Sequence, residues 1–175
     1  SLVRYENPAP GVARVVLARA DKHNSLNPEL IFAIDEAFGL ALADDAVKGI
    51  VITSGKDGSF AGSMDLNLLA KMREDAGDDP AKGLFEGTMK MHHLLRKIER
   101  AGMDPKTNKG GKPIASVLPG TAAGIGLELP LACHFRIAAS EGAKIGLPEM
   151  DLGSVPAWGG SARLPRIVGQ AHALD

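Results

Sequence analysis

The stretch PGTAAGIGLELPLACHF, residues 119–135, constrains the fold of this chain more than any other. PIASVL (113–118) precedes it and FRIAA (135–139) closes it, and both are rich in β-branched and apolar residues, as strands are. A strand, a glycine-rich turn, a short helix and a second strand in this order favour an α/β layered fold with a largely parallel sheet. Within the helix, Glu128 lies among small and apolar residues, where a carboxylate is seldom found unless it is paired, partly solvated or chemically used.

Predicted strands and helices also alternate along the rest of the chain. Asn27 is a suitable N-cap, Pro28 suits the first helical position, and Glu29 faces the positive end of the helix dipole. We expect this helix to end near Asp44, and Asp65 to cap a second one. A third helix is expected at 84–100, strands at 12–19, 48–55, 113–118 and 135–139, a short strand at 143–148, and loops at 56–64, 73–83 and 101–112.

Composition excludes several classes of function. Lys and Arg number 20 against 21 Asp and Glu, so the chain lacks the broad basic field that nucleic acids require. Cys133 is the only cysteine, so no intrachain disulfide is possible, and its apolar surroundings predict a buried inert thiol. The five histidines show no metal-binding spacing.

With no candidate membrane span and no signal-like N-terminus, we expect one soluble domain, cytoplasmic or organellar after processing.

The glycines at 120, 124 and 126 do not match a dinucleotide fingerprint, because the order of the spacings is reversed. A glycine turn before a helix still leaves the first N–H groups free to stabilise a developing negative charge. Glu128 lies in that first turn, and Glu149 follows a proline in a later turn, IGLPEMDLG. An acid or base beside such donors suits proton transfer next to a carbonyl. The alternatives are a half-buried ion pair or an exposed first-turn carboxylate for Glu128, and a simple turn residue for Glu149.

Four segments, in order, resemble the enoyl-CoA hydratase/isomerase (crotonase) superfamily: RADKHNSLN, GKDGSFAGSMDL, GKPIASVLPGTAAGIGLELPLACHFRIAA and IGLPEMDLGSVPAWGGSARLPRIVG. The spacer LLRKIERAGMDPKTNKGGKP particularly resembles the hydratase part of multifunctional fatty-acid oxidation proteins. The resemblance implies a crotonase-like spiral of β-β-α repeats, formed by residues 1–175 as one acyl-CoA-binding core. It further implies an acyl-CoA thioester as substrate, with CoA arriving as part of it and with no metal or other cofactor.

By position, the resemblance makes Glu128 and Glu149 an acid/base pair that holds a water, with Glu149 exchanging the proton at the α carbon. The thioester oxygen would accept hydrogen bonds from the N–H groups of Ile125 and of Gly62, with Ala61 as the alternative to Gly62. Residues expected to contact the substrate are Lys22, Ser63, Met64, Asp65, Gly124, Ala157 and Trp158.

Three of these contacts have simpler interpretations as well. Lys22 suits either a CoA phosphate or a solvated loop, Asp65 suits a helix cap, and Trp158 suits the core as well as a pocket wall. The chain also departs from the family pattern. Ile125 stands where consecutive glycines are usual, which narrows the backbone geometry, and Ala157 with Trp158 is expected to reshape the acyl pocket.

The expected activity is hydration of a 2-trans-enoyl-CoA to a 3-hydroxyacyl-CoA. One alternative is an enoyl-CoA isomerase on the same scaffold, and another is a non-catalytic acyl-CoA-binding or assembly subunit. Members of the family usually continue beyond RLPRIVG into helices that cover the acyl pocket and mediate trimer contacts. We expect this C-terminal helical part to be absent from the chain, and a homotrimer or dimer of trimers where it is present.

Overall fold

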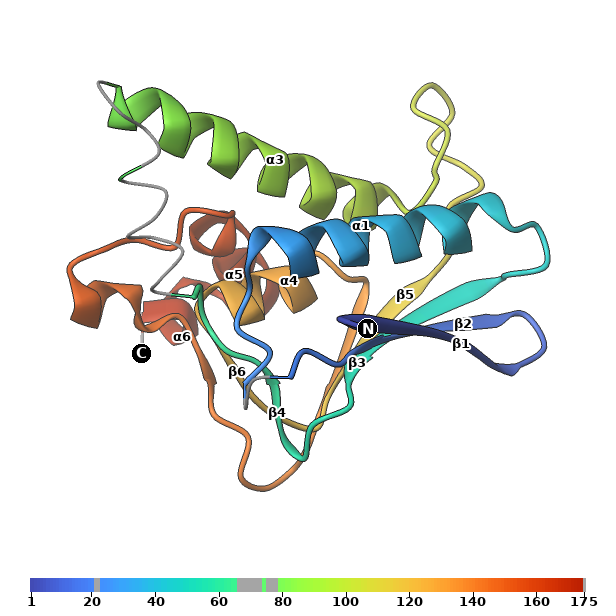
Figure 1. The fold of residues 1–175 in the computed structure, drawn as a ribbon, viewed down its shortest axis with the longest axis horizontal. Coiled ribbons are helices and arrows are strands. Elements are labelled where there is room, and N and C mark those ends of the chain that lie inside the picture. Colours follow the sequence, from blue (N-terminus) through green and yellow to red (C-terminus); the bar gives the residue numbers. More distant parts are fainter. Residues whose placement is uncertain (21–22, 66–73, 75–78, 175) are drawn as a thin grey trace.

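The structure is a computed structural model that describes residues 1–20, 23–65, 74 and 79–174 (Figure 1). It begins with a hairpin of β1 (Val3–Ala9) and β2 (Val12–Leu17), which pair antiparallel. The turn between them contains Gly11 at a φ of 77°, a backbone conformation that suits glycine. The expected strand at 12–19 is thereby confirmed, whereas β1 was not predicted from the sequence.

The next six strands form three consecutive pairs that divide between two sheets. The first member of each pair joins the hairpin, giving a five-stranded sheet of order β1-β2-β3-β5-β7, in which β2, β3, β5 and β7 run parallel. The second members form a three-stranded parallel sheet of order β4-β6-β8. This alternation is the expected spiral of β-β-α repeats. The strands are β3 (Gly49–Ser54), β4 (Gly58–Ala61), β5 (Ile114–Leu118), β6 (Gly120–Ala123), β7 (Phe135–Ala138) and β8 (Ile145–Gly146).

Two of these strands lie where the sequence predicts only loop or turn, so the prediction of an unbroken loop at 56–64 is wrong. β4 and β6 are four residues each and contain mainly small side chains. A Cβ atom added at Gly120 would lie 1.9 Å from the backbone carbon of Gly58, so the strands approach so closely that only glycine fits. Their pairing depends on this close approach rather than on intrinsic strand propensity.

Helix α1 (Pro28–Ala43) has the predicted boundaries. The side chain of Asn27 accepts a hydrogen bond from the Leu30 N–H at 3.0 Å, and Asp44 is the C-cap. The ammonium group of Lys112 donates to the carbonyls of Ala41 and Leu42, which stabilises the C-terminal end of the helix. The N-terminal signals of this helix are local, and the sequence alone therefore predicted them correctly.

Helix α3 (Pro80–Arg100) begins four residues before the predicted helix at 84–100, because Asp79 accepts a hydrogen bond from Lys82 N–H and caps it. Residues 80–83 of the exposed connection expected at 73–83 therefore belong to α3. In Figure 1, α3 lies alongside α1, and Lys97 of α3 forms an ion pair with Asp35 of α1 at 2.8 Å. The helix expected to start at Asp65 lies outside the described residues.

Four short helical segments complete the fold: α4 (Ile125–Leu131), the 3-10 helix η1 (Pro148–Leu152), α5 (Gly160–Val168) and α6 (Gln170–Leu174). The core between the sheets and helices includes fully buried Phe38, Phe60 and Leu95. Cys133 is also buried, and this burial raises the pKa of its thiol to about 12, in line with the predicted inert thiol. Within the described part of the chain, no helix is both long and apolar enough to cross a membrane.

Candidate active site

Three segments that are distant in the sequence meet at the N-terminus of α4. A Cβ atom added at Gly126 would lie 2.3 Å from the carbonyl oxygen of Ala61 and 2.6 Å from that of Gly62, so the helix lies directly against the end of β4 and the segment that follows it. Gly124 has a φ of 57°, and a Cβ atom there would lie 2.6 Å from Glu149 Oε1 and 2.8 Å from Ser63 Oγ. Gly124 therefore occupies the narrow space between these two side chains, and glycine is required there for both space and conformation.

Glu128 is completely buried on α4. Its Oε1 accepts hydrogen bonds from the backbone N–H groups of Trp158, at 3.0 Å, and Gly160, at 2.6 Å. Its Oε2 is buried and has no hydrogen-bond partner among the described residues. The structure thus excludes the exposed first-turn carboxylate. Since both amides bind one oxygen, they fix the orientation of the carboxylate and leave the other oxygen available for chemistry.

Glu149 lies on η1 with a relative exposure of 9%, and neither of its carboxylate oxygens has a hydrogen-bond partner in the described part of the chain. Burial raises the pKa of Glu128 above its ordinary value of 4.5, and the negative charge of Glu149 raises it further, while the two amides and Arg163 act in the opposite direction. The packing brings the two carboxylates, predicted to converge, to the same region: Glu149 Oε1 lies against Gly124 at the start of α4, the helix that carries Glu128. Such a pair shares protons unequally and can act as acid and base.

The raised pKa of Glu128 predicts how stability depends on pH. The folded protein retains the proton on Glu128 at pH values where the unfolded chain has lost it. The stabilising contribution is therefore full below a pH of about 4.5 and is lost as the pH rises through the folded pKa. The variant Glu128→Gln cannot lose this contribution. We expect it to become increasingly stable relative to the unmodified protein as the pH rises from 5 to 8.

Urea denaturation across this pH range measures the difference in free energy of unfolding. Glu141→Gln, the same chemical change at an exposed position, is the control for the effect of the substitution itself. If the difference in free energy of unfolding between Glu128→Gln and the unmodified protein were constant from pH 5 to 8, it would contradict the raised pKa of Glu128.

The first N–H groups of α4 suit the stabilisation of a negative charge. Leu127 N–H donates to the Gly124 carbonyl at 2.8 Å and Glu128 N–H donates to the same oxygen at 3.1 Å. The N–H groups of Ile125 and Gly126 come before these bonds, in the positions of a helix that lack internal acceptors. The Ile125 amide therefore lies at the end of the helix where a free donor is expected, and its role as one of two donors to the substrate stays a prediction.

For the first donor, the structure argues against Gly62. Its N–H donates to the carbonyl of His23 at 2.7 Å and is therefore engaged. Ala61, the alternative, is the last residue of β4 and lies opposite Ala122 in the ladder between β4 and β6. The Gly62 amide is therefore not a free donor, and this predicted position needs correction.

The backbone amide of Met64 has the free orientation that the amide of Gly62 lacks. Met64 forms an isolated parallel bridge with Leu26, in which Leu26 N–H donates to the Ser63 carbonyl and Asp65 N–H donates to the Leu26 carbonyl. In such a bridge the amide of Met64 itself points away from Leu26. The sequence pattern gave no signal for this register, because it depends on a single contact between distant segments.

The remaining predicted contacts fall into different environments. Asp65 forms an ion pair with Arg19 at 2.8 Å, which holds the segment after β4 in place. Ala157 is exposed, Trp158 is buried, and Lys22 lies outside the described residues. In the described part of the chain, no three His, Cys, Asp or Glu side chains are grouped so as to hold a metal ion.

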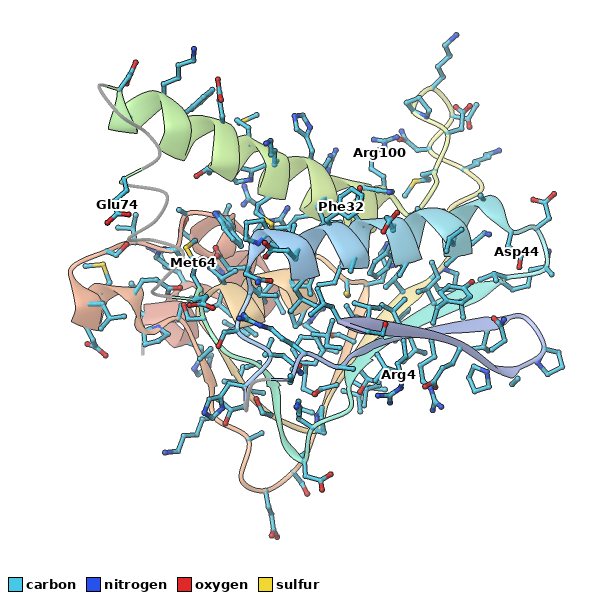
Figure 2. The ribbon with its side chains drawn as sticks, viewed as in Figure 1. Arg4, Phe32, Asp44, Met64, Glu74 and Arg100 are labelled. Atoms are coloured by element: carbon cyan, nitrogen blue, oxygen red, sulfur yellow. The ribbon has the colours of Figure 1, made fainter. Side chains whose placement is uncertain are left out.

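A cavity of about 790 Å3 lies between α1 and α3 and extends to Trp158. Trp158 lines it with its side chain while its amide holds Glu128, and Met64 lines it as well. Trp158 is therefore both a core residue and a pocket wall. Figure 2 labels two of the lining residues, Phe32 and Met64. The apolar side chains of the lining are those of Pro28, Ile31, Phe32, Met64, Met91, Leu94 and Trp158.

A crotonase-like fold with two buried carboxylates beside free backbone amides defines the class of this protein. The family model described as Enoyl-CoA hydratase/isomerase matches residues 7–175, and the chain belongs to this family. In three dimensions it is similar to an enoyl-CoA hydratase from Thermoplasma volcanium, with a TM-score of 0.80, 32% identity, and coverage of 99% of this chain and 62% of that one. An enoyl-CoA hydratase from Bacillus anthracis also has a TM-score of 0.80, at 26% identity, covering 99% of this chain and 60% of the other.

Relatives in sequence include multifunctional proteins that are much longer than this chain. The chain is 34% identical to a peroxisomal fatty acid beta-oxidation multifunctional protein of Oryza sativa subsp. japonica, covering 99% of this chain and 22% of the relative. It is 37% identical to the peroxisomal bifunctional enzyme of Danio rerio, over 99% of this chain and 21% of the relative. The chain thus spans about a fifth of the length of these curated relatives.

Proposed function

We propose that this chain is the catalytic core of an enoyl-CoA hydratase, which adds water to a 2-trans-enoyl-CoA to give a 3-hydroxyacyl-CoA. The observation that carries the proposal is the pair of buried carboxylates with three oxygens that lack hydrogen-bond partners among the described residues. An unpaired buried carboxylate oxygen costs free energy, so such a pair is maintained where it serves chemistry. Membership of a hydratase/isomerase family supports the same reaction class.

The thioester oxygen is proposed to bind between the N–H groups of Ile125 and Met64. These amides come from two segments that the close contact between Gly126 and the Ala61 carbonyl holds together. Both are positioned before substrate arrives, so they stabilise the developing enolate without reorganisation. Removing one such donor typically lowers the rate by roughly 100- to 1000-fold.

Water contributes its oxygen to the β carbon and one proton to the α carbon. Glu128, held through Oε1 by two amides, orients the water with its second oxygen. Glu149 transfers the proton from the water to the α carbon, because both of its oxygens lack other partners in the described part of the chain. Both carboxylates return to their starting protonation, so the reaction balances without a metal or a redox cofactor.

The cavity between α1 and α3 is proposed to hold the acyl chain. Its lining is mainly apolar, and it adjoins Trp158 and Met64, which belong to the two segments around the reacting atoms. An apolar pocket beside a few placed polar groups is typical of small-molecule sites. The trimeric assembly and the cytoplasmic or organellar location expected from the sequence stay predictions.

The test is turnover of two substrates by the purified protein, followed through the absorbance of the conjugated enoyl thioester. We expect loss of that absorbance with a 2-trans-enoyl-CoA. Glu128→Gln should lower this hydration by roughly 100- to 10,000-fold. A 3-enoyl-CoA assayed in parallel identifies the alternative, because an isomerase using a single carboxylate would retain activity in Glu128→Gln. Binding of an acyl-CoA analogue without turnover of either substrate would instead indicate a non-catalytic subunit.

A further inference from the structure

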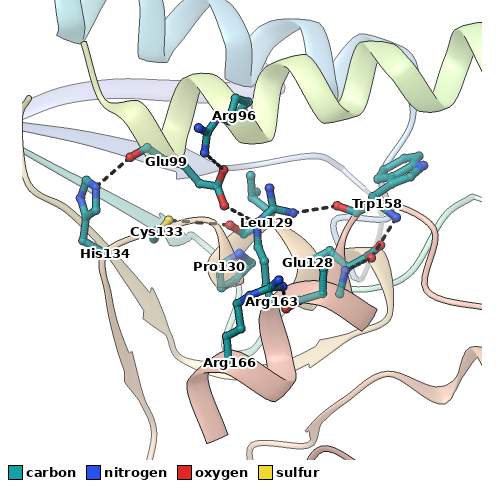
Figure 3. Close-up of polar contacts among 12 residues, drawn as sticks. Arg96, Glu99, Glu128, Leu129, Pro130, Cys133, His134, Trp158, Arg163 and Arg166 are labelled. Carbon is teal, nitrogen blue, oxygen red and sulfur yellow. Dashed lines mark hydrogen bonds and ion pairs between the residues drawn. The ribbon is translucent and has the colours of Figure 1, made fainter. Parts of the chain in front are cut away.

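Arg163 connects the turn that holds Glu128 to helix α3 (Figure 3). Its Nε donates to Glu99 Oε1 at 2.6 Å, and its Nη1 donates to the carbonyl of Trp158 at 3.0 Å. The amide of the same Trp158 donates to Glu128 Oε1. A continuous series of hydrogen bonds therefore runs from α3 through α5 to the carboxylate on α4.

The guanidinium group lies directly on the backbone of this turn. Gly159 has a φ of 101°, and a Cβ atom added there would lie 2.1 Å from Arg163 Nη1. The planar guanidinium group thus fills the space that a side chain at position 159 would occupy. Arg163 fixes the peptide between Trp158 and Gly159. It thereby also fixes the direction of the next N–H group, that of Gly160, which donates to Glu128.

The far end of the series is firmly anchored. The side chain of Arg163 is 15% exposed and that of Glu99 is 27% exposed, so the ion pair is shielded from water more than a surface pair. Burial raises the pKa of Glu99, yet the hydrogen bonds and charges of Arg163 and Arg96 outweigh it, and the pKa is lowered. Glu99 is therefore ionised at neutral pH and holds Arg163 in a single orientation.

We propose that Arg163 is a positioning residue for the reaction: its guanidinium ties the Trp158–Gly160 turn to Glu99 and thereby orients Glu128. Arg163 acts through the turn and does not line the cavity described above. Its positive charge also favours the ionised form of Glu128, against the charge of Glu149 on η1. This inference rests on the proposed function only for its effect on the rate.

The first experiment compares Arg163→Met with Arg166→Met. Arg166 lies on the same helix and donates to the carbonyl of Ala162 within that helix, so its replacement is a matched control. For Arg163→Met we expect kcat for enoyl-CoA hydration to fall roughly 10- to 100-fold, as expected for a misplaced reacting group. KM should change far less, and Arg166→Met should retain the original kcat.

The second experiment does not depend on turnover and measures the protonation of Glu128 directly. Carbon-13 NMR of the glutamate carboxyl groups, with Glu128→Gln for assignment, follows the titration of Glu128. Loss of the Arg163 charge removes an interaction that favours the carboxylate, so the midpoint should move to higher pH in Arg163→Met and stay unchanged in Arg166→Met. If the protein hydrates no enoyl-CoA, the proposed function fails, while this titration still tests the role of Arg163.

Two further variants separate position from charge and cover the case in which Arg163→Met does not fold. Arg163→Lys keeps the charge but not the planar fork, so its titration should stay near the original while kcat falls. Glu99→Gln keeps Arg163 and releases its anchor, so kcat should fall by less than in Arg163→Met. An Arg163→Met protein, or in its place a Glu99→Gln and an Arg163→Lys protein, with the original kcat and titration would overturn the proposal.

Discussion

Replacing Glu149 by Gln is expected to lower kcat for hydration of a 2-trans-enoyl-CoA by roughly 100- to 10,000-fold, the range typical for loss of a general acid or base. The amide has nearly the same shape as the carboxyl group but cannot transfer the proton to the α carbon. Steady-state kinetics by enoyl-thioester absorbance measures the effect. KM should change little, because the substitution removes a group used in the transition state rather than in binding.

Asp151→Asn provides the matched control for this experiment. Asp151 lies on the same short helix as Glu149, and its side chain is exposed. The chemical change is the same, so any effect of altered charge on η1 itself should appear in both variants. A Glu149→Gln protein that retains kcat within a few-fold of Asp151→Asn would exclude Glu149 from the chemistry.

Replacing Gly126 by Ala is expected to affect both stability and rate. The new methyl group would lie 2.3 Å from the Ala61 carbonyl and 2.6 Å from the Gly62 carbonyl, both of them backbone atoms that cannot rotate away. The helix and the segment after β4 must separate, at a cost of about 3 kcal/mol or more. For a chain of this length, such a loss lowers the melting temperature by roughly 6–12 °C.

The same separation moves the Ile125 amide away from the Met64 amide, so kcat should fall along with stability. Gly146→Ala is the control, because no atom lies within 4 Å of a Cβ added there and its backbone is not in the left-handed region. Thermal unfolding and kinetics of both variants measure the two effects. A Gly126→Ala protein as stable and as active as Gly146→Ala would contradict the close contact between these segments.

The parts of the fold that were predicted correctly are those with local causes. The boundaries of α1 follow from Asn27, Pro28 and Asp44, which act within one turn of the helix. The strands at β2, β3, β5 and β7 follow from runs of β-branched and apolar residues. The unpredicted β4 and β6 contain mainly small residues, and their pairing depends on the contact between Gly58 and Gly120, which are 62 positions apart.

The features of the candidate site also divide into those that the sequence predicted and those that it did not. Glu128 and Glu149 were identified because a carboxylate among apolar residues and glycine turns is unusual in any sequence, and because the order of motifs resembles a known family. The engaged amide of Gly62, the outward amide of Met64 and the contact of Arg163 with the Trp158 turn were not predicted. Each depends on how segments from different repeats lie against one another.

The sequence by itself determined the alternation of strands and helices, the two carboxylates, and the family to which the chain belongs. Only the tertiary structure decided which backbone amides are free and which side chain orients Glu128. The physical reason is range: caps, turns and hydrophobic periodicity act over a few residues, whereas hydrogen bonds between distant segments depend on the packing of the whole chain. A one-residue change in the register of a bridge such as Leu26–Met64 would present a different amide to the substrate without altering any local pattern.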